Sequence, residues 1–331
     1  MNVLVTGGAG YVGCHAAKLL ASEGHEIWVY DNLVFGHRAA VAPGRLIEGD
    51  LLDRGKVEAV LREQRIDAVM HFAAFAYVGE SVTDPAKYYH NNVVGTLSLM
   101  EAMRAVGVSR IVFSSTCATY GEPEQVPIRE SQPQRPINPY GFTKLIIEHA
   151  LADYGQAYGW GYAALRYFNA AGASADGDLG EDHDPETHLI PLVLQVALGQ
   201  REHVTVFGDK HPTPDGTCIR DYIHVDDLAT AHQAALERLE RGVELKLNLG
   251  TGRGSSVREV IEACRQVTGL PIPAKMAGPR AGDPPALVAD ASHARRELGW
   301  EPRYTEITPI IETAWRWHQS HPHGYDEKTR T

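Results

Sequence analysis

Cysteine is scarce in this chain of 331 residues, and the four that occur form no recognisable pattern. Cys14, Cys117, Cys218 and Cys264 show neither a CxxC pair nor the spacing of a disulfide framework. The chain opens directly on the strand-like "NVLVTG" and not on a signal peptide. These absences predict a cytoplasmic protein.

Long apolar runs and an excess of basic residues are missing as well. No apolar stretch approaches the roughly 18 to 20 residues that a membrane span needs, so no membrane association is expected. The 31 lysines and arginines against 42 acidic residues give a formal charge of −11. Because nucleic-acid binding depends on basic groups that neutralise phosphates, we expect no nucleic-acid partner. The sixteen histidines show no ligand pattern, and no metal is expected.

The chain does contain a regular alternation of short apolar strands with segments of helical periodicity. Six continuous apolar segments have the character of strands buried on both faces: "NVLVTG", "EIWVYD", "RLIEGD", "DAVMHFAA", "RIVFSST" and "GYAALRYFN". This order predicts an α/β fold with a doubly wound parallel sheet, of the Rossmann type, over residues 1–170.

The sequence changes in character after about residue 170. The acidic, glycine-rich "GASADGDLGEDHDPETH" is followed by more widely interrupted elements, which predicts a smaller α/β substrate domain over residues 171–320. The helical pattern in "YIHVDDLATAHQAALERLE" indicates that the chain returns to the large sheet near residues 222–250, so this domain is expected to be discontinuous. The polar residues 321–331 are expected to form a flexible tail.

The first motif, "VTGGAGYVG", is a strand that runs into Gly7, Gly10 and Gly13 and then into a helix. Glycines permit a tight turn and let backbone amides approach a pyrophosphate at the helix N-terminus. Asp31 ends the next strand, close to the ~20 residues expected beyond the glycines. Its carboxylate is suited to accept hydrogen bonds from ribose hydroxyls and to repel a 2'-phosphate, which favours NAD over NADP.

Both acidic residues near this motif have a structural alternative. Asp31 and Asn32 are also typical of a turn that ends a strand. Asp50, in "EGDLLD", would either reach the adenine or cap the following helix, and the sequence leaves this open.

The second motif is the pair Tyr140 and Lys144 in "NPYGFTK". One helical turn separates them, so a helix directs both side chains to one place. Such a pair also arises by chance, and its position carries the inference: it opens a helix after the fifth strand, where the strand ends face a nicotinamide. A free tyrosine has a pKa of about 10, so a tyrosine base needs positive charge nearby, which Lys144 and the cationic ring supply.

The strand "RIVFSST" delivers Thr116 to the same edge of the sheet. Its hydroxyl is predicted to hydrogen-bond the substrate oxygen that Tyr140 deprotonates, with a purely structural turn hydroxyl as the alternative. Ser114 and Ser115 are predicted to bond to backbone, and Cys117 and Thr119 to serve packing or the turn.

Ten blocks of sequence together resemble a known family. The blocks are "TGGAGYVG", "DNL", "HFAA", "NNVVGTL", "FSSTCATYG", "NPYGFTK", "RYFNAAGA", "TPDGTCIRDYIHVDDLA", "NLGTG" and "AGDPPALVADASHARRELGW". In this order, and over essentially the whole chain, they resemble the extended short-chain dehydrogenases, specifically the UDP-glucose (UDP-galactose) 4-epimerases. The resemblance implies tightly held NAD, epimerisation at C4 of a UDP-sugar through a 4-keto intermediate, and a homodimer. The interface of this dimer would include the helices in "PAKYYHNNVVGTLSLMEAMRAVG" and the helix that begins near Tyr140.

The resemblance also implies roles for individual residues. It implies that Thr116, Tyr140 and Lys144 form the catalytic group. For NAD it implies Gly7, Gly10, Tyr11, Val12, Gly13, Asp31, Asn32, Asp50, Leu51, Phe72, Ala73, Ala74, Asn92, Ser114, Tyr140, Lys144 and Phe168. For the UDP-sugar it implies Thr116, Tyr140, Asn169, Leu189, Phe207, Arg220, Arg280, Asp283 and Leu287. The two arginines suit a diphosphate, and Asp283 suits ribose hydroxyls.

Two departures from the family pattern affect the expected cofactor and substrate. Many members carry a lysine where this chain has Ala76, which removes one pyrophosphate contact. Leu287 occupies a position where some members have tyrosine, whose ring excludes an N-acetyl group. UDP-N-acetylhexosamines therefore remain an alternative substrate, as do UDP-pentoses, because "SSTCATYGEP" also resembles pentose 4-epimerases.

Two other functions compete with epimerisation. A nucleotide-sugar 4,6-dehydratase requires an Asp-Glu acid/base pair after the threonine, where this chain has Cys117 and Ala118. A non-catalytic NAD-binding sensor is expected to lose Tyr140, Lys144 or the arginines, and this chain retains them.

Overall fold

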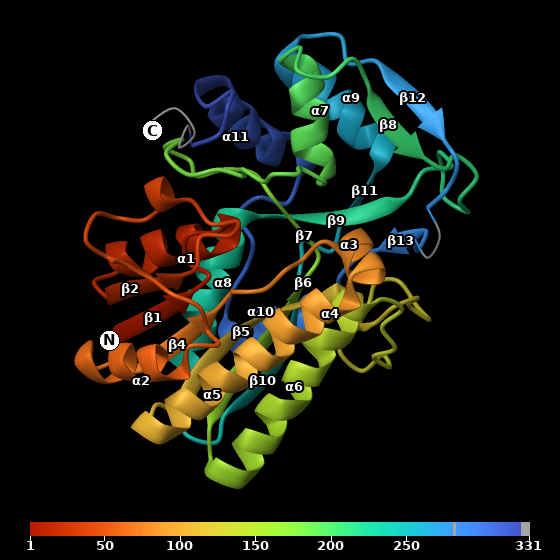
Figure 1. Cartoon of the computed structure of the whole chain (residues 1–331). Coiled ribbons are helices and arrows are strands. Elements are labelled where there is room, and N and C mark those ends of the chain that lie inside the picture. The colour runs from red at the N-terminus through yellow and green to blue at the C-terminus, as the bar shows by residue number, and fades with distance from the viewer. Residues whose placement is uncertain (281–282, 326–331) are drawn as a thin grey trace.

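A seven-stranded parallel sheet forms the centre of the computed structural model, which describes residues 1–280 and 283–325. The strand order is β10-β6-β5-β4-β1-β2-β3 (Figure 1). The strands are β1 (Asn2–Thr6), β2 (Glu26–Asp31), β3 (Leu46–Glu48), β4 (Ala68–His71), β5 (Arg110–Thr116), β6 (Gly161–Tyr167) and β10 (Glu244–Leu249). All six segments predicted as strands are present, and the predicted doubly wound α/β fold is confirmed.

Helices cover both faces of this sheet, because successive strand residues point to opposite sides. Val3 and Val5 pack on one face and Leu4 on the other, and all three are fully buried. The first face carries α1 (Tyr11–Ser22), α8 (Val225–Arg238) and α10 (Ser292–Leu298), and the second carries α2 (Arg54–Glu63), α5 (Gly95–Val106) and α6 (Pro139–Tyr158). Burial of each such side chain contributes about 1.5–3 kcal/mol, so both faces stabilise the sheet.

A second, smaller group of elements lies beyond the carboxyl edge of the large sheet (Figure 1). It contains β7 (Asn169–Ala171), α7 (Leu189–Ala197), β8 (Val204–Phe207), β9 (Ile219–His224), β11 (Gly254–Ser256), α9 (Val257–Thr268), β12 (Ala274–Ala277), β13 (Ala286–Leu287) and α11 (Ile307–Ser320). Between β9 and β11 the chain returns to the large sheet, where α8 packs and β10 pairs with β6. The division into two domains at residue 170 stays a prediction.

Short elements complete the connections. They are η1 (Arg38–Ala40), α3 (Val78–Thr83), α4 (Pro85–Tyr88), η2 (Tyr89–Val94) and η3 (Cys117–Thr119). Among the described residues no helix is both long and apolar enough to cross a membrane.

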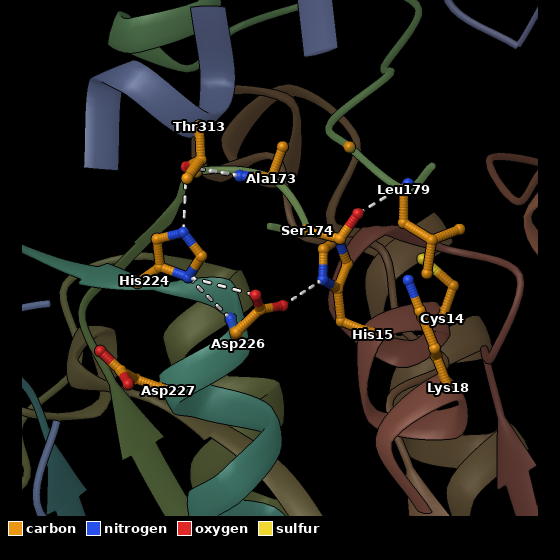
Figure 2. A network of polar contacts seen from close by, with 12 residues as sticks. Cys14, His15, Lys18, Ala173, Ser174, Leu179, His224, Asp226, Asp227 and Thr313 are labelled. Atoms are coloured by element: carbon orange, nitrogen blue, oxygen red, sulfur yellow. Dashed lines mark hydrogen bonds and ion pairs between the residues drawn. The ribbon is translucent and has the colours of Figure 1, made fainter. Parts of the chain in front are cut away.

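A buried polar network fastens the smaller group to α1 and α8 (Figure 2). His224 Nδ1 accepts a hydrogen bond from Asp226 N at 3.0 Å, and its Nε2 donates to Thr313 Oγ1 on α11 at 3.0 Å. The Asp226 carboxylate contacts His15 Nδ1 on α1 at 2.8 Å, and Thr313 Oγ1 accepts from Ala173 N at 3.1 Å. The neutral, fully buried His224 imidazole therefore joins α8 to α11, and the Asp226 carboxylate extends the network to α1.

The end of the chain is partly anchored. Residues 321–325 belong to the predicted flexible tail, yet Tyr325 N donates to Asp182 Oδ2 at 3.0 Å. Gly180 N donates to the Tyr325 hydroxyl at 3.1 Å. The rest of the predicted tail, 326–331, lies outside the described residues.

The network predicts that acid weakens the fold through His224. Burial lowers the His224 pKa from 6.5 to about 4, and the nearby Asp226 opposes this only in part. Because only the unfolded state binds a proton here between these values, stability is lost as pH falls below about 6.5. Between pH 7 and pH 5 this histidine should cost up to about 2 kcal/mol of the free energy of unfolding.

Urea unfolding of the wild type and of His224→Asn at both pH values measures this contribution. Asparagine can still accept from the first turn of α8 but does not titrate. The variant should lose less stability on acidification than the wild type, and an equal loss in both would contradict the assignment.

Candidate active site

The large cavity lies where the strand order reverses between β1 and β4, the position at which open α/β sheets bind ligands. Its volume is about 1090 Å³. It is lined by most residues that the sequence singled out: Gly7, Gly10, Tyr11, Val12, Gly13, Asp31, Asn32, Asp50, Leu51, Phe72, Ala73, Ala74, Ser114, Thr116, Tyr140, Lys144, Phe168, Asn169, Arg220, Arg280, Asp283 and Leu287. One continuous space thus joins both predicted motifs to the predicted diphosphate arginines.

The glycine-rich loop is shaped for close backbone contact. Gly7 has a φ of +72°, and a Cβ at this position would lie 2.4 Å from Ala73 N on the neighbouring strand end. A Cβ on Gly13 would lie 2.3 Å from Gly7 O. Helix α1 begins at Tyr11 after the N-cap Gly10, no side chain caps its first amides, and its first residues line the cavity. This loop and helix start fit a pyrophosphate.

Asp31 ends β2 as predicted and lies beside the glycine loop. Its Oδ2 accepts from Ala9 N at 3.0 Å and its Oδ1 from Leu33 N at 2.9 Å. Burial raises the Asp31 pKa above its usual range, and the two backbone hydrogen bonds oppose this shift. The carboxylate therefore holds the turn, and because it also lines the cavity, its contact with a ligand stays a prediction.

Asp50 does not cap the next helix. The cap of α2 is Asp53, whose carboxylate accepts from Lys56 N at 3.0 Å. Asp50 instead accepts from Asn32 Nδ2 at 3.0 Å at the cavity wall. Of the two interpretations left open by the sequence, the helix cap is wrong, and a ligand contact stays a prediction.

Tyr140 and Lys144 lie in the first turns of α6, which begins with Asn138 as its cap and Pro139 as its first residue. The Asn138 side chain accepts from Gly141 N at 2.8 Å. Lys144 Nζ donates to Ser114 O at 2.7 Å and lies 5.9 Å from the centre of the Tyr140 ring. The helix therefore brings the pair together as its spacing predicted.

Burial dominates the acid/base properties of this pair. It lowers the Lys144 pKa to about 7, with the nearby Glu148 carboxylate acting in the opposite direction. It raises the Tyr140 pKa well above 10, and a hydrogen bond with Thr116 opposes this rise. The phenolate form of Tyr140, which is the form that can accept a proton, therefore needs positive charge close by to be populated at neutral pH.

Thr116 ends β5 at the cavity wall. Its Oγ1 accepts from Ala118 N at 3.2 Å, so the hydroxyl also supports the short helix η3. Cys117 beside it is buried, and burial raises its thiol pKa to about 12. The thiol is therefore unsuited to acid/base chemistry at neutral pH.

The predicted UDP-sugar residues form the opposite wall. Arg220 on β9 is ion-paired with Asp283, and its Nη1 donates to Pro284 O at 2.9 Å. The Arg280 guanidinium stacks on the Phe207 ring, 4.0 Å from its centre. Arg220 and Asp283, which the sequence treated as separate ligands, thus restrain each other.

Three predicted site residues do not line the cavity: Asn92, Leu189 and Phe207. Asn92 is buried and bridges Phe75 to Thr143, with its Oδ1 accepting from Phe75 N at 2.8 Å. It positions the backbone of a residue that does line the cavity. Phe207 contacts the cavity only indirectly, through the Arg280 guanidinium that stacks on its ring. Leu189 is the residue after His188, which does line the cavity.

The comparison with known families agrees with this geometry. Residues 3–250 match the NAD dependent epimerase/dehydratase family. The chain belongs to this family.

Individual members of the family are similar over the whole chain. The UDP-glucose 4-epimerase of Halalkalibacterium halodurans is 54% identical, over 100% of this chain and 99% of that protein. The crystal structure of UDP-glucose 4-epimerase from Brucella ovis in complex with NAD is 56% identical, with a TM-score of 0.92 over 95% and 97% of the two chains. A Stenotrophomonas maltophila UDP-glucose-4-epimerase, solved with bound NAD and formylated UDP-arabinopyranose, is 41% identical, with a TM-score of 0.94 over 97% and 99%. The family expected from the ten sequence blocks is confirmed.

The positions of Ser114 and Ser115 in this epimerase/dehydratase differ from the prediction of backbone bonds. Ser114 Oγ and the Tyr167 hydroxyl lie 2.6 Å apart, and Ser115 Oγ donates to Glu148 Oε1 at 2.5 Å. Both serines bond to side chains because helix α6 and strand β6 place polar groups against β5.

Glu148 is a residue that the sequence interpretation missed. Its carboxylate accepts hydrogen bonds from Arg166 Nε at 2.9 Å and from Arg166 Nη2 at 2.6 Å. Both side chains are buried, with 4% of Glu148 and 3% of Arg166 exposed. Glu148 lies one turn beyond Lys144 on α6, so helical spacing alone would have placed it on the same face. The pair ties α6 to β6.

A second missed group is the cluster Glu181, His183, Glu186 and His188, three of whose members line the cavity wall. The sequence analysis predicted no metal. The spacing within "EDHDPETH" is the signal that could have drawn attention to this cluster.

Replacing Glu148 by glutamine should strongly destabilise the protein. The substitution keeps the side-chain volume but leaves the Arg166 charge buried without a counterion, which typically costs about 3–5 kcal/mol. The matched control is Glu58→Gln, which breaks the exposed Arg54–Glu58 pair and should cost at most about 1 kcal/mol. Denaturant unfolding measures both, and similar small losses would contradict a structural role for the buried pair.

Proposed function

We propose that this protein interconverts UDP-galactose and UDP-glucose by epimerisation at C4, with NAD as its cofactor. The observation that carries the proposal is the single cavity in which Tyr140, Lys144 and Thr116 face a space between the glycine loop and the arginine wall. The similar proteins of Halalkalibacterium halodurans and Brucella ovis bear the name of this activity, the latter solved with NAD.

The residues present fit NAD. The uncapped start of α1 and the close approach at Gly7 suit the pyrophosphate, and the Asp31 carboxylate suits ribose hydroxyls. When bound, NAD would accept the hydrogen at C4 as a hydride, with its two electrons, and return it in the same form. Lys144 is placed for the nicotinamide ribose, and Phe168 lies on the wall beside it.

The chain's own residues supply the proton chemistry. Tyr140 removes the proton of the sugar 4-hydroxyl and later returns it, while Thr116 hydrogen-bonds the same oxygen. The positive charge of Lys144 and of the bound cofactor lowers the Tyr140 pKa from the raised value that burial imposes. C4 is inverted because the 4-ketosugar presents its other face before the hydrogen returns.

The opposite wall holds the nucleotide and leaves the hexose free to turn. Arg220 and Arg280 offer two guanidinium groups for the diphosphate, and Asp283 offers a carboxylate for ribose hydroxyls. Firm binding at this end allows rotation of the sugar about its phosphate linkage. A dehydratase is disfavoured, because Cys117 has a raised pKa and Ala118 carries no acid.

The homodimer and the cytoplasmic location also remain proposals. Exposed apolar side chains on and before α5 and α6, namely Tyr89, Val94, Leu97 and Phe142, support a partner on this helical face.

The first test incubates purified protein with UDP-galactose, without added NAD, and separates the UDP-sugars by chromatography. The wild type should form UDP-glucose, and Tyr140→Phe should lower the rate by at least about 10² to 10⁴-fold, the contribution typical of a positioned acid/base group. Tyr158→Phe, at the exposed far end of α6, is the matched control and should retain the wild-type rate. If no product forms even with added NAD, the proposed epimerisation of UDP-galactose is rejected and the non-catalytic NAD-binding sensor remains as the alternative.

A second test concerns the sugar, through Leu287. This side chain lines the cavity and packs beside Phe168 and Cys117. We expect the wild type to accept UDP-N-acetylgalactosamine as well as UDP-galactose. Leu287→Tyr should lower the epimerisation rate of UDP-N-acetylgalactosamine by about tenfold or more and leave the rate on UDP-galactose unchanged, because the tyrosine ring fills the space of the acetyl group.

Leu287→Met conserves the volume and serves as the control. UDP-xylose and UDP-arabinose complete the substrate panel, since pentoses are the other alternative. A wild type that is active on UDP-galactose and inactive on UDP-N-acetylgalactosamine would reject the role given to Leu287.

A further inference from the structure

Four potential metal ligands converge in one short segment between β7 and α7. Glu181, His183, Glu186 and His188 each offer an atom within 4.8 Å of the others. His188 Nδ1 lies 2.9 Å from Glu181 Oε1 and 3.1 Å from Glu186 Oε1. His183 Nδ1 lies 3.3 Å from Glu181 Oε1 and 3.6 Å from Glu186 Oε2.

These separations of 2.9 to 3.6 Å are close to those between neighbouring ligand atoms around a metal ion, with Glu186 offering Oε1 toward His188 and Oε2 toward His183. Bonds of about 2.0–2.1 Å to a tetrahedral Zn²⁺ place its ligand atoms roughly 3.3 Å apart. Two imidazoles and two carboxylates are also a set that divalent first-row transition ions accept. The geometry and the chemistry of the donors therefore agree.

The hydrogen bonding of His183 supports the same conclusion independently. Its Nδ1 atom is buried and lies 3.3 and 3.6 Å from two carboxylate oxygens, but neither contact among the described residues has the distance and direction of a good hydrogen bond. The carboxylates of Glu181 and Glu186 are themselves only 5% and 4% exposed. A buried ring nitrogen without a hydrogen bond is costly, and coordination to an ion removes that cost.

The backbone that carries the ligands is held from both sides. Leu179 N donates to Ser174 Oγ at 3.0 Å, as Figure 2 shows, and Tyr325 binds both Gly180 and Asp182. His37 Nε2 donates to the carbonyl of Asp182 at 3.0 Å. The segment is thus already ordered by contacts that do not involve the ligand atoms.

One ligand is ordered further by its own neighbours. Glu186 Oε1 accepts from Thr187 N at 2.7 Å and from His188 N at 2.8 Å. These bonds fix the carboxylate in the way that outer-sphere hydrogen bonds orient metal ligands. A site held in this way loses little entropy when an ion enters.

We propose that Glu181, His183, Glu186 and His188 bind one divalent transition-metal ion, with Zn²⁺ as the best fit. Four protein ligands leave no open position, so the ion has a structural role and not a Lewis-acid role in catalysis. It fastens the cavity wall beside Tyr11, whose ring centre lies 6.2 Å from that of His183. The proposal rests on this cluster alone and not on the epimerase activity.

The test uses the full-length protein without a histidine tag, stripped of metal by a chelator and then titrated with Co²⁺. Tetrahedral Co²⁺ has an intense visible absorption band that reports its geometry directly. We expect the band to saturate at one Co²⁺ per chain and to disappear when one equivalent of Zn²⁺ is added. A weak octahedral spectrum, or no saturation at one equivalent, would overturn the proposal.

Two variants identify the ligands. His183→Gln and Glu186→Gln should each abolish the band and weaken Zn²⁺ binding beyond the 10- to 100-fold that loss of an outer-sphere partner typically costs. Circular dichroism confirms that each variant is folded, and either one that folds suffices. Unchanged Co²⁺ binding in a folded variant would show that the cluster is only a set of histidine–carboxylate ion pairs.

The matched control is His293→Gln. His293 lies 3.9 Å from Glu130 and 3.6 Å from Glu297, but it is 38% exposed and belongs to no convergent metal-ligand group among the residues that the structure describes. This variant should keep the full band, and loss of the band here would assign the Co²⁺ to a different site. Because the readout is metal binding, failure of the proposed epimerisation leaves the result intact.

Discussion

The parallel alignment of the seven strands is the constraint on which the rest of the structure depends. In a parallel sheet every strand ends at the same edge, so Thr6, Asp31 and Thr116 reach one side of the molecule. Reversal of the strand order between β1 and β4 opens the space above that edge. The helices on both faces exclude water from the sheet and leave the edge as the place for a ligand.

Burial of the side chains at that edge then shifts their pKa values. Lys144 is fully enclosed between β5 and α6, and burial brings its pKa from 10.5 to about 7. The same burial makes the Tyr140 phenol a weaker acid than in water. The pKa of each group is therefore sensitive to any charge that enters the cavity, as is common for ionisable groups at functional sites. The buried Glu148–Arg166 pair keeps α6, the helix that carries Tyr140 and Lys144, against the sheet.

The smaller group of elements contributes the second wall through contacts between distant parts of the chain. Arg220 is held by Asp283 across 63 residues, and Arg280 is held by the ring of Phe207. His224 and Thr313 join this group to the segment that carries Glu181 to His188. Buried polar contacts thus help to fix the position of one wall relative to the other, together with the small apolar cluster of Cys117, Phe168 and Ala289.

The sequence by itself determined the parallel sheet, the glycine loop, Asp31 and the Tyr140–Lys144 pair. Each of these is local: periodicity, a turn or one helical repeat places the residues without knowledge of the rest of the chain. Only the tertiary structure decided that Ser115 bonds to Glu148, that Asp53 caps α2 in place of Asp50, and that Arg220 pairs with Asp283. It also brought two histidines and two glutamates of an acidic loop into one cluster. Such contacts follow from how the chain packs in space, because side-chain partners in a folded protein are chosen by distance and burial, and sequence spacing alone does not specify either.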